Sequence, residues 1–143
     1  MHVPGFLFID HVAISVPLGK LDEQVQKYEQ MGFRVLHREE VYGTDQVREV
    51  LLEVPEGPNL IQLLEPMTPD SPVAKQMEKA GGRGGLAHVA WRVSDIQAAF
   101  EHLKSLGLPL LDAAPRKGSR GTTIFFIHPK ALGHLVEVVA TSA

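Results

Sequence analysis

The 143-residue chain contains no cysteine, few aromatic residues and no long hydrophobic run. The lack of cysteine excludes disulfides, thiolate metal ligands and a cysteine nucleophile. Any transition-metal site must therefore use histidine, carboxylate and neutral oxygen donors. The sequence shows no stretch of membrane-spanning length, and its start lacks a basic leader with a long apolar run and cleavage site. A soluble cytoplasmic protein is thus the expectation.

The chain also lacks a strong excess of either charge. Its formal net charge is -3, which gives no general reason to expect nucleic acid or an anionic membrane as a partner. The length suits one ordinary domain or two small modules that share a core.

An internal repeat is the main feature that is present. "HVAISV" at 11–16 and "HVAWRV" at 88–93 align His11 with His88 and continue through two further identities and a shared final valine. Apolar residues at helical spacing then predict helices over 21–33 and 95–108, each ending near a glycine, Gly32 or Gly107. The shared order of elements indicates a true repeat rather than chance identity.

Three strand-like segments follow each of these helices, so that each half is predicted to be β-α-β-β-β. Their ranges are 33–40, 46–54 and 59–66 in the first half, and 108–114, 122–128 and 134–140 in the second. A connecting helix is expected after the first half, with Ser71 as N-cap and Pro72 at its first position. We interpret the chain as one domain, 1–143, with modules at 6–66 and 86–141 and a connecting helix and glycine-rich hinge at 67–85.

The period of two in strands puts one polar residue on the first strand and one on the last strand of each module. These residues are His11 and Gln62 in the first module, and His88 and Glu137 in the second. Pseudo-twofold pairing of the modules would bring them together as two imidazoles, an amide oxygen and a carboxylate, a donor set suited to a divalent cation. A hydrogen-bonded structural role is the alternative for any one of them.

Glu49 is a candidate acid or base. It shares a strand face with Val47 and Leu51, and desolvation among apolar neighbours would raise the pKa of its carboxyl group toward the useful range. Glu53 lies on the same face, so a solvated strand face is the alternative.

Several motifs together resemble one known family. The paired "HVAISV" and "HVAWRV", "HREE", "DSPVAK" before a glycine-rich hinge and "HPKALGHLVEV" are similar to the vicinal oxygen chelate superfamily, and within it to the methylmalonyl-CoA epimerases. The resemblance covers about residues 9–139. It implies an α+β fold in which two tandem β-α-β-β-β modules form a curved mixed sheet around a metal-binding cleft.

The resemblance also implies an activity. The four residues of the repeat occupy the places of the family's metal ligands, Glu49 that of a catalytic acid/base, and Glu137 serves as the opposite one. The implied reaction is divalent-metal-dependent epimerisation of (2R)/(2S)-methylmalonyl-CoA, by removal and return of the α-proton through a metal-stabilised enolate. The implied metal is Co2+, with Mn2+, Ni2+ or Zn2+ as alternatives, the partner is a CoA thioester, and the assembly is a homodimer.

Basic residues near the end of the chain offer contacts for the phosphates of coenzyme A. They are Arg116, Lys117, Arg120 and Lys130. A solvated basic loop is an equal alternative, and the sequence singles out none of them.

The chain departs from the family pattern at two places. It has Ala87 before His88 where the family often has a second histidine, and His134 where a small apolar residue is usual. Two other functions remain open for the same fold: a glyoxalase I-like metal isomerase, and a metal-free protein that binds a small molecule such as an antibiotic. The neutral Gln62 argues against the first, and the retention of two histidines with a carboxylate argues against the second.

Overall fold

The computed structural model describes residues 2–142 and divides the chain into two compact units. The central unit is His11–Ala87, and the terminal unit combines residues 1–10 with residues 88–143. The chain passes between the units within two strands, β1 (Phe6–Ser15) and β5 (Gly85–Val93). No helix in the described part of the chain is long and apolar enough to cross a membrane.

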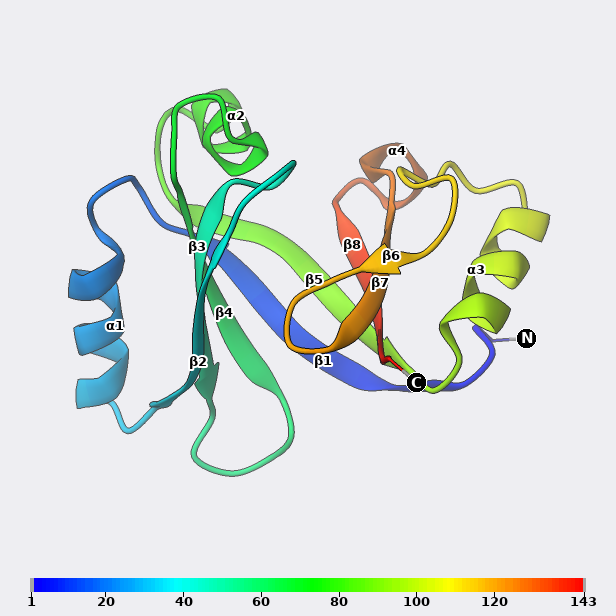
Figure 1. Ribbon diagram of the computed structural model, residues 1–143, viewed down its shortest axis with the longest axis horizontal. Coiled ribbons are helices and arrows are strands. Elements are labelled where there is room, and N and C mark those ends of the chain that lie inside the picture. Colours follow the sequence, from blue (N-terminus) through cyan, green and yellow to red (C-terminus); the bar gives the residue numbers. More distant parts are fainter. Residues whose placement is uncertain (1, 143) are drawn as a thin grey trace. The chain divides into compact units, whose positions relative to one another are not determined.

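The central unit carries four neighbouring strands in the order β2-β3-β4-β1. Strands β2 (Arg34–Val41), β3 (Val47–Glu53) and β4 (Leu60–Pro66) pair antiparallel in succession, whereas β4 pairs parallel with β1. Helix α1 (Leu21–Gln30) connects β1 to β2 and lies along one face of these strands (Figure 1). The parallel pair places the first and last strands of the module side by side.

The terminal unit repeats this arrangement, with strand order β5-β8-β7-β6. Helix α3 follows β5, β8 pairs parallel with β5, and β7 pairs antiparallel with both β8 and β6. The bounds are α3 (Ile96–Ser105), β6 (Arg116–Lys117), β7 (Thr122–Ile127), α4 (Pro129–Leu132) and β8 (Val136–Thr141). The predicted β-α-β-β-β order is therefore found in both halves, with the four-residue helix α4 added before the last strand of the second half.

The predicted strand over 108–114 is wrong. Only Leu110 forms a bridge there, to Ile127, and the short strand β6 comes later. Pro109 has no N–H to donate, and the Asp112 carboxylate accepts a hydrogen bond from the Phe126 N–H in place of a main-chain oxygen (2.8 Å). Strand pairing is thereby interrupted after one bridge.

The predicted helix ends are approximately right. Both long helices stop three residues earlier than predicted, and Gly32 and Gly107 follow them with φ of 98° and 78°, the left-handed conformation that closes a helix. Helix α2 (Pro72–Lys79) begins after Ser71, as predicted. The Ser71 hydroxyl makes no cap hydrogen bond, however, because it donates to the carbonyl of Asp45 (3.1 Å).

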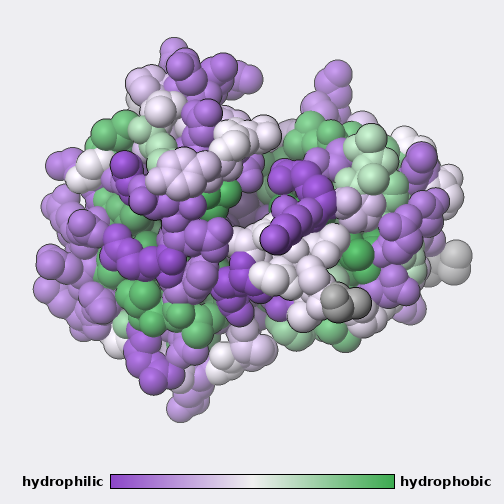
Figure 2. All heavy atoms as spheres, in the orientation of Figure 1, coloured by the Kyte–Doolittle hydropathy of each residue, from purple (hydrophilic) through white to green (hydrophobic). Residues whose placement is uncertain are grey.

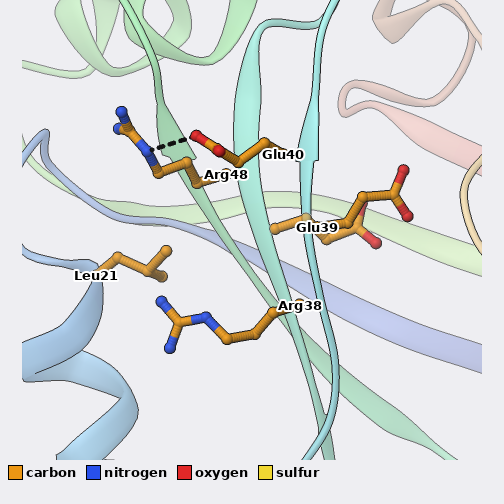
Figure 3. A pocket seen from close by; sticks show the side chains of 6 residues that line it. Leu21, Arg38, Glu39, Glu40 and Arg48 are labelled. Atoms are coloured by element: carbon orange, nitrogen blue, oxygen red, sulfur yellow. Dashed lines mark hydrogen bonds and ion pairs between the residues drawn. The ribbon is translucent and has the colours of Figure 1, made fainter.

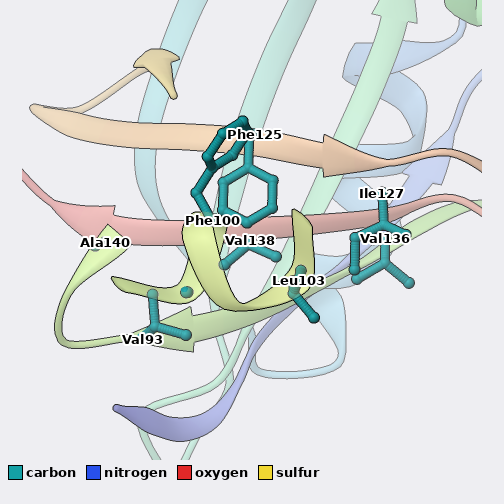
Figure 4. Packing of buried hydrophobic residues seen from close by; sticks show 9 residues of the cluster. Val93, Phe100, Leu103, Phe125, Ile127, Val136, Val138 and Ala140 are labelled. Carbon is teal, nitrogen blue, oxygen red and sulfur yellow. The ribbon is translucent and has the colours of Figure 1, made fainter. Parts of the chain in front are cut away.

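Each unit has its own hydrophobic core beneath its helix. In the terminal unit, Phe100 of α3 meets Phe125 of β7 edge to face at 5.1 Å between ring centroids, within the cluster drawn in Figure 4. In the central unit, Leu21 and Val25 of α1 pack with buried side chains of β3 and β4. On the face drawn in Figure 2, hydrophilic residues surround smaller hydrophobic patches. The large apolar side chains of each first strand thus face the helix, as the alternation predicts.

A buried glutamate attaches the start of α1 to the sheet. Glu65 on β4 is 4% exposed, and its carboxylate accepts hydrogen bonds from the N–H groups of Gly19 (2.6 Å) and Leu21 (3.2 Å) and from Arg48 (3.1 Å). The Leu21 N–H belongs to the first turn of the helix, where no partner within the helix exists, and the Gly19 N–H lies just before the N-cap residue Lys20. A negative charge is also favourable at that end of the helix dipole.

We expect Glu65→Ala to lower the free energy of unfolding by about 2–4 kcal/mol, because it leaves two N–H groups and an arginine without their acceptor. Urea denaturation followed by circular dichroism measures this. Glu53→Ala removes an exposed ion pair with Arg34 and is the matched control, with an effect within about 1 kcal/mol. An equal loss in both variants would contradict the role of Glu65.

Candidate active site

The second half of the predicted ligand set lies within the terminal unit. His88 on β5 and Glu137 on β8 are 7% and 8% exposed, and His88 Nε2 lies 4.0 Å from Glu137 Oε2. Glu137 is opposite Ala90 in the parallel pair and opposite Phe126 in the antiparallel pair. The Phe126 ring meets the imidazole of His88 edge to face at 5.5 Å between centroids. An aromatic side chain therefore lies against the imidazole of His88.

The first half lies within the central unit at equivalent places. His11 on β1 and Gln62 on β4 are 5% and 6% exposed, and Gln62 is opposite Ala13 and Leu51 in its two strand pairs. Each module therefore puts a histidine two residues before an alanine, and the polar residue of the last strand opposite that alanine. The small alanine leaves space beside the polar side chains.

The carbonyl oxygen of Gln62 is an unsatisfied buried acceptor. Among the described residues, Gln62 Oε1 is the buried side-chain polar atom that has no hydrogen-bond partner. Burial without a partner costs free energy, so such an atom indicates a ligand or another function. The described side chains suited to holding a metal ion are His11, His88 and Glu137, all buried. Two imidazoles, a carboxylate and an amide oxygen fit a divalent transition metal.

Glu49 is buried in the central unit, only 5% exposed on β3. It is opposite Leu64 of β4 on one side and Glu39 of β2 on the other. The solvated alternative is therefore wrong for Glu49, although Glu53 is half-buried and bonded to Arg34. Burial disfavours a charged carboxylate and suits a group that must accept and release a proton near neutral pH.

The pattern of the sequence did not reveal Glu39 as a neighbour of Glu49. The Glu39 carboxylate forms a hydrogen bond with His37 Nε2 (2.8 Å). The two residues are two positions apart on β2, so both side chains point to the same side of that strand. The pairing depends on the β2–β3 register, which a bulge between Val35 and His37 shifts. The spacing of His37 and Glu39 in "HREE" indicates that both side chains lie on one face of a strand. It does not indicate that this strand pairs with β3, which places Glu39 opposite Glu49.

An open pocket of about 520 Å3 borders Glu49, and none of the four predicted metal ligands lines it (Figure 3). Its two arginines are already paired, Arg38 with Asp22 at 2.7 Å and Arg48 with Glu40 and Glu65. The hydrogen bond to Glu65 raises the pKa of Arg48 above its ordinary value. These cations neutralise the glutamates around them rather than offer a free anion site.

The two unassigned features of the sequence lie in the terminal unit. The predicted last strand began at His134, but β8 begins at Val136. His134 therefore lies exposed in the turn before the strand, and its predicted place on a strand face is wrong. Of the basic residues near the end of the chain, Arg116 is engaged by Asp112 at 2.9 Å and stacks on the Phe126 ring. Lys117, Arg120 and Lys130 are exposed.

Comparison with known proteins shows the family to which the chain belongs. The model of the Glyoxalase/Bleomycin resistance protein/Dioxygenase superfamily matches residues 10–126. The ethylmalonyl-CoA/methylmalonyl-CoA epimerase of Cereibacter sphaeroides is 32% identical over 132 residues, which are 91% of this chain and 95% of that protein. The chain belongs to the methylmalonyl-CoA epimerase family.

Solved structures of methylmalonyl-CoA epimerases share the fold. The Mycobacterium tuberculosis enzyme superimposes with a TM-score of 0.89 at 34% identity and covers 100% of this chain and 93% of its own. A variant of the Streptomyces coelicolor enzyme in complex with 2-nitronate-propionyl-CoA gives 0.87 at 35% identity, with 96% of each chain covered. The vicinal oxygen chelate fold predicted for this member of the epimerase family is therefore confirmed.

We expect Gln62→Leu to stabilise the metal-free protein by about 1 kcal/mol, because it removes a buried acceptor without a partner. The same change should reduce the rise in melting temperature caused by added Co2+, since an oxygen donor is lost. Differential scanning calorimetry with and without Co2+ measures both effects. Gln97→Leu, on the exposed side of α3, is the control and should leave the response to Co2+ intact. A loss of stability without metal and an unchanged response to it would refute this role for Gln62.

Proposed function

We propose that this protein epimerises methylmalonyl-CoA. The observation that carries the proposal is the burial of two histidines, a glutamine oxygen and two glutamates at the positions that the family pattern marks, in a chain that belongs to the epimerase family. The substrate is a CoA thioester whose α-hydrogen is weakly acidic.

We assign His11, Gln62, His88 and Glu137 as ligands of a divalent metal, with Co2+ as the native ion. When bound, the metal supplies positive charge where negative charge develops on the thioester oxygen. The orphaned oxygen of Gln62 and the 4.0 Å approach of His88 to Glu137 support this assignment.

We assign Glu49 and Glu137 as the two acid/base groups. Inversion of a carbon requires that a proton leave from one side and return to the other, so two groups are needed. The comparison of the two modules supports the assignment of Glu49, because the equivalent position in the second module has no ionisable side chain. Glu49 is opposite Leu64, and the equivalent residue of the second module, opposite Val139, is Ile124. The central unit thus provides a buried carboxylate at a place where the terminal unit has a hydrocarbon side chain.

The remaining expectations from the family are also part of the proposal. We infer a homodimer that works in the cytoplasm, in the metabolism of propionate. Two other functions were open for this fold. The curated relative argues against a glyoxalase I-like isomerase, and the buried histidine and carboxylate side chains argue against a metal-free binding protein.

Incubation of the cobalt-loaded protein with one stereoisomer of methylmalonyl-CoA in deuterated water tests the function. We expect racemisation together with deuterium at the α-carbon, because the returned proton comes from groups that exchange with solvent. Mass spectrometry and chiral analysis of the thioester provide the measurement. Absence of exchange in the presence of Co2+ would defeat the proposal, and the adduct of methylglyoxal and glutathione would be the next substrate to assay.

Glu49→Gln tests the assignment of the acid/base group. We expect kcat/KM to fall by about 10²–10⁴-fold, since an amide cannot accept the α-proton, with metal content unchanged. Glu53→Gln, four residues along the same strand, is the matched control and should retain activity near that of the unaltered protein. Full racemising rate in Glu49→Gln with normal metal content would show that the two-base assignment is wrong.

A further inference from the structure

Glu39 of β2 is the ionisable side chain directly opposite Glu49, on the same face of the sheet. Opposite residues of an antiparallel pair have Cβ atoms about 4.5–5.5 Å apart, so the two carboxylates are within reach of each other directly or through one water molecule. The other positions next to Glu49 on this face carry hydrocarbon side chains, Val47, Leu51 and Leu64. Within strands β2, β3 and β4, Glu39 is thus the adjacent group that can exchange a proton with Glu49.

The two glutamates differ in their access to water. Glu49 is 5% exposed, whereas the side chain of Glu39 is 37% exposed. Strand β2 is the first in the strand order and therefore forms an edge of the sheet. Both glutamates line the open pocket of about 520 Å3 (Figure 3). A route from the buried carboxylate to solvent therefore leads past Glu39.

A histidine holds Glu39 on this route. His37 Nε2 lies 2.8 Å from Glu39 Oε1, and the two residues share one side of β2. Figure 3 shows Glu39 directed away from Arg38 and Glu40, its neighbours along the strand, which belong to other ion pairs. The partner of Glu39 is thus an imidazole, which takes up and releases protons near neutral pH, and not a permanently charged arginine.

The proposed reaction leaves Glu49 with a proton that has to depart. In one direction, Glu49 takes the α-proton, and Glu137 gives a different proton to the opposite side of the carbon. Glu49 is then protonated when the product leaves, and another turnover in the same direction requires its carboxylate form. The balance over one turnover is one proton released to solvent from Glu49 and one taken from solvent by Glu137.

We propose that Glu39 carries this proton between Glu49 and solvent and so restores Glu49 between turnovers. Protonated Glu49 gives its proton to the Glu39 carboxylate, and Glu39 releases it to bulk water. The reverse reaction uses the same steps in the opposite order, and the hydrogen bond from His37 positions Glu39 for both. This inference rests on the proposed function, because the proton concerned is the one that Glu49 removes from the substrate.

Initial-rate kinetics of Glu39→Gln test the proposal. The amide keeps an oxygen that accepts a hydrogen bond from His37, but it cannot carry the proton. We expect kcat and KM for methylmalonyl-CoA to fall together, about three- to tenfold, with kcat/KM unchanged, because Glu49 is restored in the free enzyme after the product has left. A merely structural role would lower kcat/KM or the melting temperature instead.

Acetate separates the loss of a proton carrier from other causes of a lower kcat. The open pocket beside Glu49 has room for so small an acid, so acetate at constant ionic strength should raise kcat of Glu39→Gln toward that of the unaltered protein. Glu40→Gln is the matched control, because Glu40 is the next residue of β2, lies on its other side and pairs with Arg48 at 3.3 Å. Its kcat and KM should equal those of the unaltered protein, with or without acetate.

The possible outcomes distinguish this inference from the proposed function. If the unaltered protein epimerises methylmalonyl-CoA and Glu39→Gln keeps the same kcat, the proton does not pass through Glu39, although the protein is an epimerase. A fall in kcat/KM, or a lower kcat that acetate does not restore, would overturn the inference in the same way. If the unaltered protein does not exchange the α-proton in the presence of Co2+, both the function and the role of Glu39 are wrong.

Discussion

The parallel pairing of the first and last strands in each module is the constraint on which the site depends. It puts Gln62 opposite Ala13 and Glu137 opposite Ala90, in the same register in both units. Because side chains alternate along a strand, a shift of one residue in either pair would turn the polar side chain into the hydrophobic core under the helix. The large apolar residues on the other face, packed against α1 or α3, therefore fix the register and keep the polar set on its own face.

Burial of so many polar side chains has a thermodynamic cost that the fold compensates unequally. Glu65 is fully engaged by two N–H groups and an arginine, so that its burial stabilises the start of α1. Gln62 lacks a partner for its oxygen, and this difference separates a structural glutamate from a residue whose acceptor oxygen is free to bind a ligand. Two polar residues on the same strand, three positions apart, thus have opposite roles because they face opposite sides of the sheet.

The sequence predicted the features that follow from periodicity. The repeat, both long helices, the closing glycines and the shared strand face of the four repeated polar residues could be read from spacing and alternation. The sequence left Glu49 open between a buried and a solvated strand face, and the structure shows it buried. The absence of a strand over 108–114 could not be read in this way. It depends on the Asp112 side chain, which accepts the hydrogen bond from the Phe126 N–H of β7 in place of a main-chain oxygen. Likewise, the position of Glu39 opposite Glu49 depends on a bulge.

Glu49 and Ile124 occupy equivalent positions in the two modules, and the difference between them has a consequence for how such a protein can arise. Two identical modules assembled as separate chains would have the same residue at this place, either two carboxylates or none. A single chain that contains both copies allows each to change independently, so that one acquires an ionisable group while the other keeps a hydrocarbon. The tandem arrangement thereby permits the chemical asymmetry that a reaction at a stereogenic carbon demands from a scaffold built by duplication.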